Sequence, residues 1–448
     1  MAELPNLASP PDRYPTRPAR PRALVSWALY DWANSAHPTL ITTFVFAAYF
    51  TQAVAADPLA GTAQWGYATS LAALAVAFIG PVAGAIADNS GRRKPWLGAA
   101  TVCAVLATGA LWFVHPSPAH AGWALVLVAL GIFFFELGMV FYNAMLPTLV
   151  PRAQIGRLSG LAWGLGYLGG LAALVLALHG FVKAESSWFG VGSEDAANVR
   201  AVAPLAAAWF ALFALPLFLF TPDSAKTGLK IGAAAKAGLV QLAATARKVR
   251  GFRHLVLFLL AMMCASNGLT TLFAFGGIYA ASTFGLDFEE LLLFGIAMNV
   301  TAGLGAAAFG WLDDAIGPRR TLLIALLGLF VLGAAILLAE NKTAFWAAAL
   351  PLGLFVGPAQ AAGRSFMAHA APVEMRVEMF GLYALAGKAT NFLGPAVLAW
   401  VTEAFQSQRL GMASILAFFV VGGALMLFVP DPRALNIAPV SGKDNNRP

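Results

Sequence analysis

Charge is scarce in this sequence. Asp, Glu, Lys and Arg make up 11% of its 448 residues, whereas soluble globular domains carry about 25%. The mean hydropathy is +0.74, and apolar runs of about 20 residues, the length that crosses a hydrocarbon core of about 30 Å, recur along the whole chain. The composition predicts an integral membrane protein and leaves no room for a separate soluble domain of useful size.

Residues that carry chemistry are also few. The two cysteines, Cys103 and Cys264, lie in apolar runs, so we expect them to pack and not to form a disulfide. The six histidines are scattered without metal-ligand spacing, and there is no Gly-x-x-x-x-Gly-Lys-Ser/Thr phosphate loop. We therefore expect no metal, no cofactor, no ATP-driven pumping and no enzymatic activity.

Breaks at proline, glycine and charge clusters predict twelve membrane spans. The spans are expected to begin near Ala23, Trp65, Trp96, Gly122, Leu158, Ala201, His254, Glu289, Thr321, Ala344, Met379 and Gly411. The first 22 residues hold six prolines and no apolar core of a signal peptide, so they are predicted to be a disordered cytoplasmic tail. The expected parts are thus a tail at 1–22, a six-helix bundle at 23–220, a basic cytoplasmic connector at 221–253, a second six-helix bundle at 254–429 and a cytoplasmic tail at 430–448.

Basic residues are distributed unequally between the two ends of these spans. Twenty-two Lys and Arg residues fall on the side of the termini and four on the other side, namely Lys183, Arg200, Lys342 and Arg409. The positive-inside rule then predicts that both termini are cytoplasmic. The basic connector lacks the aromatic platforms of a nucleic-acid surface, so we expect no nucleic-acid partner.

An internal repeat divides the chain into two halves. GAIADNSGRRK (Gly84–Lys94) and GWLDDAIGPRR (Gly310–Arg320) share the pattern G-x-x-x-D-x-x-G-x-[RK]-[RK] at an offset of 226 residues. GLAWGLG (Gly160–Gly166) and GLYALAG (Gly381–Gly387) repeat at an offset of 221. Two duplicated six-span halves are typical of transporters built from parallel repeats.

The repeated loop predicts a cytoplasmic gate. An Asp at a helix end can accept hydrogen bonds from backbone N–H groups or pair with a base, while glycine lets two helices approach. An ordinary acidic-basic turn is the alternative, which the second copy disfavours. The expected gate residues are Gly84, Asp88, Gly91, Arg93, Lys94, Gly310, Asp314, Arg319 and Arg320. With its loops after spans two and eight, the chain resembles the major facilitator superfamily.

Four ionisable residues lie inside the predicted spans: Asp31, Glu136, Arg364 and Lys388. Each costs about 2.5–3.5 kcal/mol at the centre of a membrane helix, so they should face protein, water or each other. Helical spacing places all four at similar depth, about 10 to 15 Å from the cytoplasmic helix ends. Two acids in the first half and two bases in the second half predict a bipolar cavity.

Amide side chains accompany these charges at helical spacing. In the major facilitator fold, spans one, four, seven and ten line the central cavity, and that resemblance adds a residue of span seven. The expected substrate or coupling residues are Asp31, Asn34, Glu136, Asn143, Asn267, Gln360, Arg364, Lys388 and Asn391. Such a cavity suits a zwitterion or an organic anion, because Arg364 can hold a carboxylate bidentately and an acid can meet an ammonium or a proton. Permanent acid–base pairs that join the halves remain the alternative.

The first span opens with YDWANSAH (Tyr30–His37). It resembles the YDWANS signature of the major facilitator subfamily that contains the fungal vacuolar amino-acid effluxers linked to autophagy and many bacterial proteins. Three further stretches are similar to that subfamily: GAIADNSGRRKPW, GLAWGLGYLGG, and QAAGRSFMAHAAP followed by EMFGLYALAGKATNFLGP. The resemblance covers nearly the full chain.

Together these features predict an all-helical, twelve-span major facilitator that moves a small polar solute by alternating access. An amino acid or similar zwitterion, moved with protons, is the expected substrate; peptides, sugars or organic anions are alternatives, and so is a membrane sensor or scaffold that binds without transport. We expect a monomer in the inner membrane of a bacterium. The solute, the direction and the coupling ion stay open.

Overall fold

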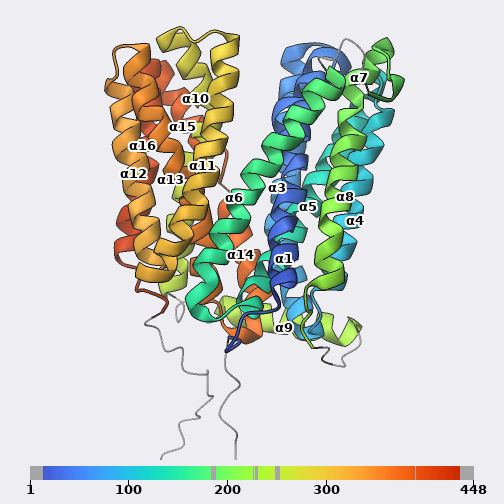
Figure 1. Cartoon of the computed structure of the whole chain (residues 1–448), viewed down its shortest axis with the longest axis vertical. Coiled ribbons are helices and arrows are strands. Elements are labelled where there is room, and N and C mark those ends of the chain that lie inside the picture. The colour runs from blue at the N-terminus through green and yellow to red at the C-terminus, as the bar shows by residue number, and fades with distance from the viewer. Residues whose placement is uncertain are drawn as a thin grey trace, which may run out of the picture.

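The computed structural model describes residues 14–182, 188–225, 227, 231–247, 253–388 and 390–433. Residues 1–13 and 434–448 of the two expected tails, and 226, 228–230 and 248–252 of the expected connector, lie outside this range. Regular structure in the described part of the chain is helical (Figure 1).

The first half of the chain forms one bundle. Its helices are α1 (Pro21–Asn34), η1 (His37–Phe44), α2 (Phe46–Tyr49), η2 (Phe50–Val54), α3 (Pro58–Ser90), α4 (Lys94–Ala110), α5 (Ala121–Leu149), α6 (Ile155–Ala177), α7 (Ala197–Arg200) and α8 (Val202–Phe220). The second span begins at Pro58, earlier than the expected Trp65, because Asp57 caps it with a bond from the Ala60 N–H and Pro58 occupies its first turn.

The second half forms the other bundle, and α9 (Ile231–Arg247) connects the two. The bundle contains α10 (Arg253–Phe284), α11 (Phe288–Ile316), α12 (Pro318–Leu338), α13 (Lys342–Ala370), α14 (Arg376–Lys388), α15 (Leu393–Phe405) and α16 (Gln408–Leu427). Side-chain caps from Asp287, Asn341 and Ser407 begin α11, α13 and α16. These starts agree with the spans expected from the sequence.

Ten helices in the described residues are long and apolar enough to cross a membrane without interruption. Two further spans complete the expected twelve and are interrupted. The first runs through α1, η1, α2 and η2, and its α-helical pattern widens to π-type turns at His37–Phe44, a segment whose second residue is Pro38. The eleventh ends as α14 at Lys388 and resumes as α15 at Leu393. Both interruptions follow closely on a predicted membrane charge, Asp31 or Lys388.

The two bundles stand side by side and meet near the end of the molecule at which α1 begins and α16 ends (Figure 1). We call this end the tail side; Pro21, Lys94 and Gly317 lie on it. Contact between the bundles is most extensive where α3 packs on α14 and α6 packs on α11. Toward the opposite side the helices of the two bundles diverge (Figure 1).

The segment before α1 contacts both bundles on the tail side. The Tyr14 hydroxyl donates to the backbone oxygens of Ala368 (3.2 Å) and His369 (3.3 Å) in α13, and the Ala19 N–H donates to the Leu149 oxygen of α5 (2.7 Å). From Tyr14 onward, the stretch expected as a disordered tail therefore has defined partners in the protein.

Candidate functional site

Asp31 of α1 and Arg364 of α13 form an ion pair between the bundles. Arg364 Nη1 lies 2.8 Å from Asp31 Oδ2, and the two residues are only 1% and 5% exposed, respectively. The other guanidinium nitrogens are also used: Nε donates to the Ser159 hydroxyl (3.0 Å) and Nη2 to the Ser159 backbone oxygen (2.6 Å). The pair is dry, and each guanidinium nitrogen has a protein partner.

Aromatic rings enclose the Arg364 guanidinium. Its central carbon lies 5.2 Å from the ring centre of Trp27, 5.5 Å from that of Trp163 and 5.8 Å from that of Tyr142. Trp27 and Tyr142 stack on each other at 4.5 Å. Cation–π attraction adds to the ion pair and is strongest where water is excluded, as it is here.

Glu136 of α5 and Lys388 of α14 form the second pair between the bundles. Lys388 Nζ lies 2.7 Å from Glu136 Oε1, and the side chains are 35% and 17% exposed for lysine and glutamate. Lys388 is the last residue of α14, directly before the interruption of the eleventh span. The expectation that all four membrane charges share a solvated cavity thus does not hold for Asp31 and Arg364, which are buried, while this pair is partly open.

Three of the predicted amides lie at the contact between the two bundles, which we call the seam. Asn34 Nδ2 lies 3.4 Å from Asp31 Oδ1, and Arg364 Nη1 lies 3.4 Å from Asn143 Oδ1, so both amides belong to the buried pair. Gln360 of α13 accepts a 3.0 Å bond from the Tyr167 hydroxyl of α6, which is a further link between the bundles.

Asn267 and Asn391 hold the interruption of the eleventh span. Asn267 is 2% exposed; its Nδ2 donates to Thr390 Oγ1 (2.9 Å), and its Oδ1 accepts from the Gly394 N–H (2.9 Å). Asn391 Oδ1 accepts a 3.2 Å bond from the Ser266 hydroxyl. A Cβ at Gly394 would collide with Thr271 Oγ1. Asn267 was expected to line the central cavity from span seven. It instead bonds within the C-terminal bundle.

The first copy of the repeated loop forms hydrogen bonds to the opposite bundle. Asp88 Oδ2 accepts bonds from the backbone N–H groups of Val377 (2.9 Å) and Glu378 (3.0 Å) in the first turn of α14. Arg93 Nη2 lies 3.9 Å from Asp88 Oδ1. A Cβ at Gly84 would lie 2.6 Å from the Val377 oxygen, so only glycine permits this approach.

The second copy makes the corresponding contact in the other direction. Asp314 Oδ1 accepts from the Gly156 N–H (2.8 Å) and Oδ2 from Arg157 Nε (2.6 Å) in the first turn of α6. A Cβ at Gly310 would lie 2.9 Å from the Gly156 oxygen. Each bundle thus places one aspartate on a helix N-terminus of the other, and we call the two contacts the Asp88 clamp and the Asp314 clamp.

The remaining residues of the predicted gate stabilise these loops within their own bundle. Gly91 and Gly317 have φ of 83° and 96°, which side-chain-bearing residues rarely adopt, and they end α3 and α11. Lys94 Nζ donates to the Thr221 oxygen (2.6 Å), and Arg319 donates to the last carbonyls of α16. Arg320 is exposed.

Sequence reasoning missed the partners that complete the site. Ser159, Trp163 and Arg157 all lie at the start of α6, where the repeated GLAWGLG motif marks the position but not its contacts. Trp27 lies one helical turn before Asp31, and that spacing was the available signal. Burial and distance between bundles cannot be read from spacing within one helix.

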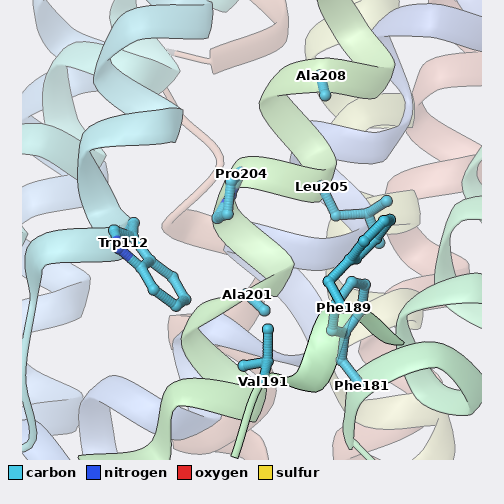
Figure 2. Close-up of a pocket in the computed structure, with 8 residues that line it drawn as sticks. All are labelled: Trp112, Phe181, Phe189, Val191, Ala201, Pro204, Leu205 and Ala208. Atoms are coloured by element: carbon cyan, nitrogen blue, oxygen red, sulfur yellow. The ribbon is translucent and has the colours of Figure 1, made fainter. Parts of the chain in front are cut away.

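An apolar hollow of about 470 Å³ lies at the other side of the N-terminal bundle (Figure 2). Trp112, Phe189, Leu205 and Ala208 are among the side chains that line it (Figure 2). None of the predicted site residues lines this hollow, so it is separate from the charged seam.

Solved structures with the same arrangement are major facilitators. The chain aligns with the transporter FucP, a fucose:proton symporter of E. coli, with a TM-score of 0.70 and 17% identity over 92% of this chain and 98% of FucP. The human organic anion transporter MFSD10 aligns with a TM-score of 0.68 and 17% identity over 93% of this chain and 100% of its own. Fold and ion pairs thus define a twelve-helix membrane protein of the class that has the major facilitator fold.

Sequence comparison gives the family within that class. The model described as "Vacuole effluxer Atg22 like" matches residues 58–438. The chain therefore belongs to the Atg22-like family of major facilitators, as the YDWANS resemblance predicted.

Individual relatives differ in how much of their length is matched. The uncharacterized MFS-type transporter YxiO of Bacillus subtilis is 27% identical over 92% of this chain and 96% of its own length. Autophagy-related protein 22 of Coccidioides immitis is 22% identical over 61% of this chain and 48% of its own. The match thus spans about half the length of that fungal relative.

Proposed function

We propose that this protein is a secondary carrier of a small zwitterion such as an amino acid, and that Glu136 and Lys388 are its substrate contacts. The observation that carries the proposal is the pair itself: opposite charges from opposite bundles, 2.7 Å apart and partly exposed, beside an interrupted helix. Carriers of this class place their sites near the midplane at the repeat interface, often at discontinuous helices.

A zwitterion can replace this ion pair group for group. Its carboxylate meets the Lys388 ammonium and its ammonium meets the Glu136 carboxylate, so both protein charges stay compensated when the pair opens. Arg364 is a poorer substrate contact than expected, because each of its guanidinium nitrogens already has a protein partner. We assign Asp31 and Arg364, with Asn34 and Asn143, to joining the bundles.

A proton is the coupling ion that this arrangement supports. When the bundles separate, Glu136 loses the lysine that compensates it, and binding a proton neutralises the carboxylate at that step. The Asp88 and Asp314 clamps hold the tail side closed, which makes the described state the one that opens on the opposite side. Because the sequence predicts 22 of the basic residues on the side of the termini, we place the tail side in the cytoplasm and the protein in the inner membrane of a bacterium.

Flux in proteoliposomes tests the proposal. Proteoliposomes that contain the purified protein are loaded with an unlabelled amino-acid mixture. Uptake of labelled amino acids is then measured with and without a pH gradient. We expect exchange in the unmodified protein, loss of exchange in Lys388→Met, and loss of the pH-gradient response in Glu136→Gln. Glu340→Gln is the matched control, because Glu340 is an exposed acid at the end of α12 on the opposite side.

Three outcomes contradict the proposal. Exchange that survives Lys388→Met removes the pair from the substrate path. A pH response that survives Glu136→Gln removes proton coupling through that carboxylate. Stabilisation by an amino acid in a thermal-shift assay without any flux assigns the protein to ligand sensing.

A further inference from the structure

Helix α9 lies across the tail side, where it crosses the end of α3 (Figure 1). One face is pressed onto α3: Ala234 is fully buried, and a Cβ at Gly238 would lie 2.8 Å from the backbone of Ala85 and Ile86. Because the two backbones are in contact at Gly238, α9 cannot rotate about its axis without losing this packing. Its orientation across the span ends is therefore set by packing.

The next residues of α9 expose aliphatic surface. Leu239 is 53% exposed and Val240 is 64% exposed, while Lys236, one turn earlier, is also exposed. Apolar side chains beside a cation on a helix that lies across the span ends are typical of helices in the plane of a membrane surface.

The charge of this segment has one sign. From Lys226 to Arg253 the sequence contains seven Lys or Arg residues and no Asp or Glu. The nearest acid before it, Asp223, is already bound to the Arg92 side chain (3.2 Å) and to the Arg93 N–H (2.9 Å). The positive-inside rule accounts for cations on this side, but it requires neither the exposed Leu239–Val240 pair nor a helix laid across α3.

We propose that α9 is a docking surface for anionic phospholipid, with Leu239 and Val240 among the acyl chains and the exposed Lys236 at the phosphate headgroups. Headgroup attraction supplies the selectivity for anionic lipid, and it weakens with salt. Because α9 is bound at Ala85 and Ile86, this surface is attached to the part of α3 that carries Asp88.

Spin-label accessibility in nanodiscs tests this proposal. In a protein with Cys103→Ser and Cys264→Ser, single labels are placed by Leu239→Cys, by Gly232→Cys, which has open space around it, and by Leu106→Cys on the outer face of α4. Collisions of each spin label with oxygen and with a water-soluble nickel chelate are measured in two kinds of nanodisc. One contains equal parts of phosphatidylglycerol and phosphatidylcholine, and the other contains phosphatidylcholine alone.

In the anionic discs we expect the Leu239 label to collide with oxygen as the Leu106 label does, and to be shielded from nickel at least severalfold relative to the Gly232 label. In phosphatidylcholine alone, in high salt, or with Lys236→Gln added, shielding from nickel should fall. Arg17→Gln, which removes an exposed tail-side cation outside α9, should leave it unchanged.

The proposal is overturned if the Leu239 label is as accessible to nickel as the Gly232 label in anionic discs. It is also overturned if shielding is equal in both lipids, which would mean apolar insertion without headgroup selectivity. Shielding from both reagents would show that protein covers this face.

Discussion

The two ion pairs across the seam have the same composition, one acid from the first half and one base from the second, yet different surroundings. Asp31 and Arg364 are buried, and aromatic rings and Ser159 enclose the guanidinium. Glu136 and Lys388 remain partly exposed at the end of an interrupted helix. A buried pair is costly to break because each charge then stays buried without its opposite charge, whereas solvent can reach the charges of a partly exposed pair. Under the proposed function, the same pair of charges joins the bundles in one place and binds substrate in the other.

The largest effect is expected from removing one charge of the buried pair. Asp31→Asn leaves the Arg364 guanidinium uncompensated in a dry site, so we expect a loss of about 3–5 kcal/mol in stability. Thermal unfolding of the purified protein in detergent measures it, with Glu136→Gln as the matched variant of the exposed pair. Equal melting temperatures for the two variants would remove the distinction between the pairs.

Lys388→Met should affect transport far more than stability. A lost hydrogen bond to a charged group is worth about 1.5–3 kcal/mol, which corresponds to about a tenfold to hundredfold loss in apparent substrate affinity. Concentration dependence of exchange in proteoliposomes measures this. If Lys388→Met lowers the yield of folded protein and leaves the substrate affinity unchanged, Lys388 joins the bundles as Arg364 does.

Gly84→Ala tests whether the Asp88 clamp keeps closed the tail side of the seam that both pairs cross. The added Cβ lies 2.6 Å from the Val377 oxygen, and overpacking of this kind costs about 1–3 kcal/mol, so the Asp88 clamp should open. Alkylation of a single cysteine introduced at Ala87, which is buried, should become faster. Gly423→Ala is the control, since nothing lies within 4 Å of its Cβ; an unchanged rate in Gly84→Ala counts against the clamp.

The smallest effect is expected at an ion pair inside one bundle and outside the membrane core. Lys342 Nζ donates to Glu290 at 2.7 Å, and this hydrogen bond lowers the pKa of the Glu290 carboxyl below its usual 4.5. A lowered folded-state pKa gives stability that is present above the unfolded pKa and is lost as pH falls through the folded value. Glu290→Gln should therefore lower the melting temperature slightly at pH 7, and the difference should vanish in acid below pH 4.5. If the difference in melting temperature persists in acid, the effect of Glu290→Gln comes from the Asp287 capping box and not from the charge of Glu290.

Much of the fold was predictable because it depends on local composition and repetition. Helix starts, the duplication and the two Asp loops follow from apolar run length and from the repeated pattern, which act along one segment at a time. Glu136 and Lys388 were recognisable as functional candidates because charge within a membrane span is costly. The pairing of each acid with one particular base was not, since spacing along a helix says nothing about which helix lies opposite.

Some assignments changed for reasons that only distance and burial reveal. Asn267 was expected in a cavity and instead holds the interruption at 390–392 through Thr390 and Gly394. Tyr14, expected within a disordered tail, bonds to α13.

By itself, the order of residues determined that this chain lies in a membrane, that it crosses twelve times, that its halves are copies, and that four charges sit within the spans. These properties follow from transfer free energies and from repetition, and they need no knowledge of neighbours. Tertiary structure decided which charges meet, which of the two pairs stays dry, and where two spans are interrupted. Those outcomes depend on what packs around each group, because burial and the contacts between bundles set the cost of separating opposite charges.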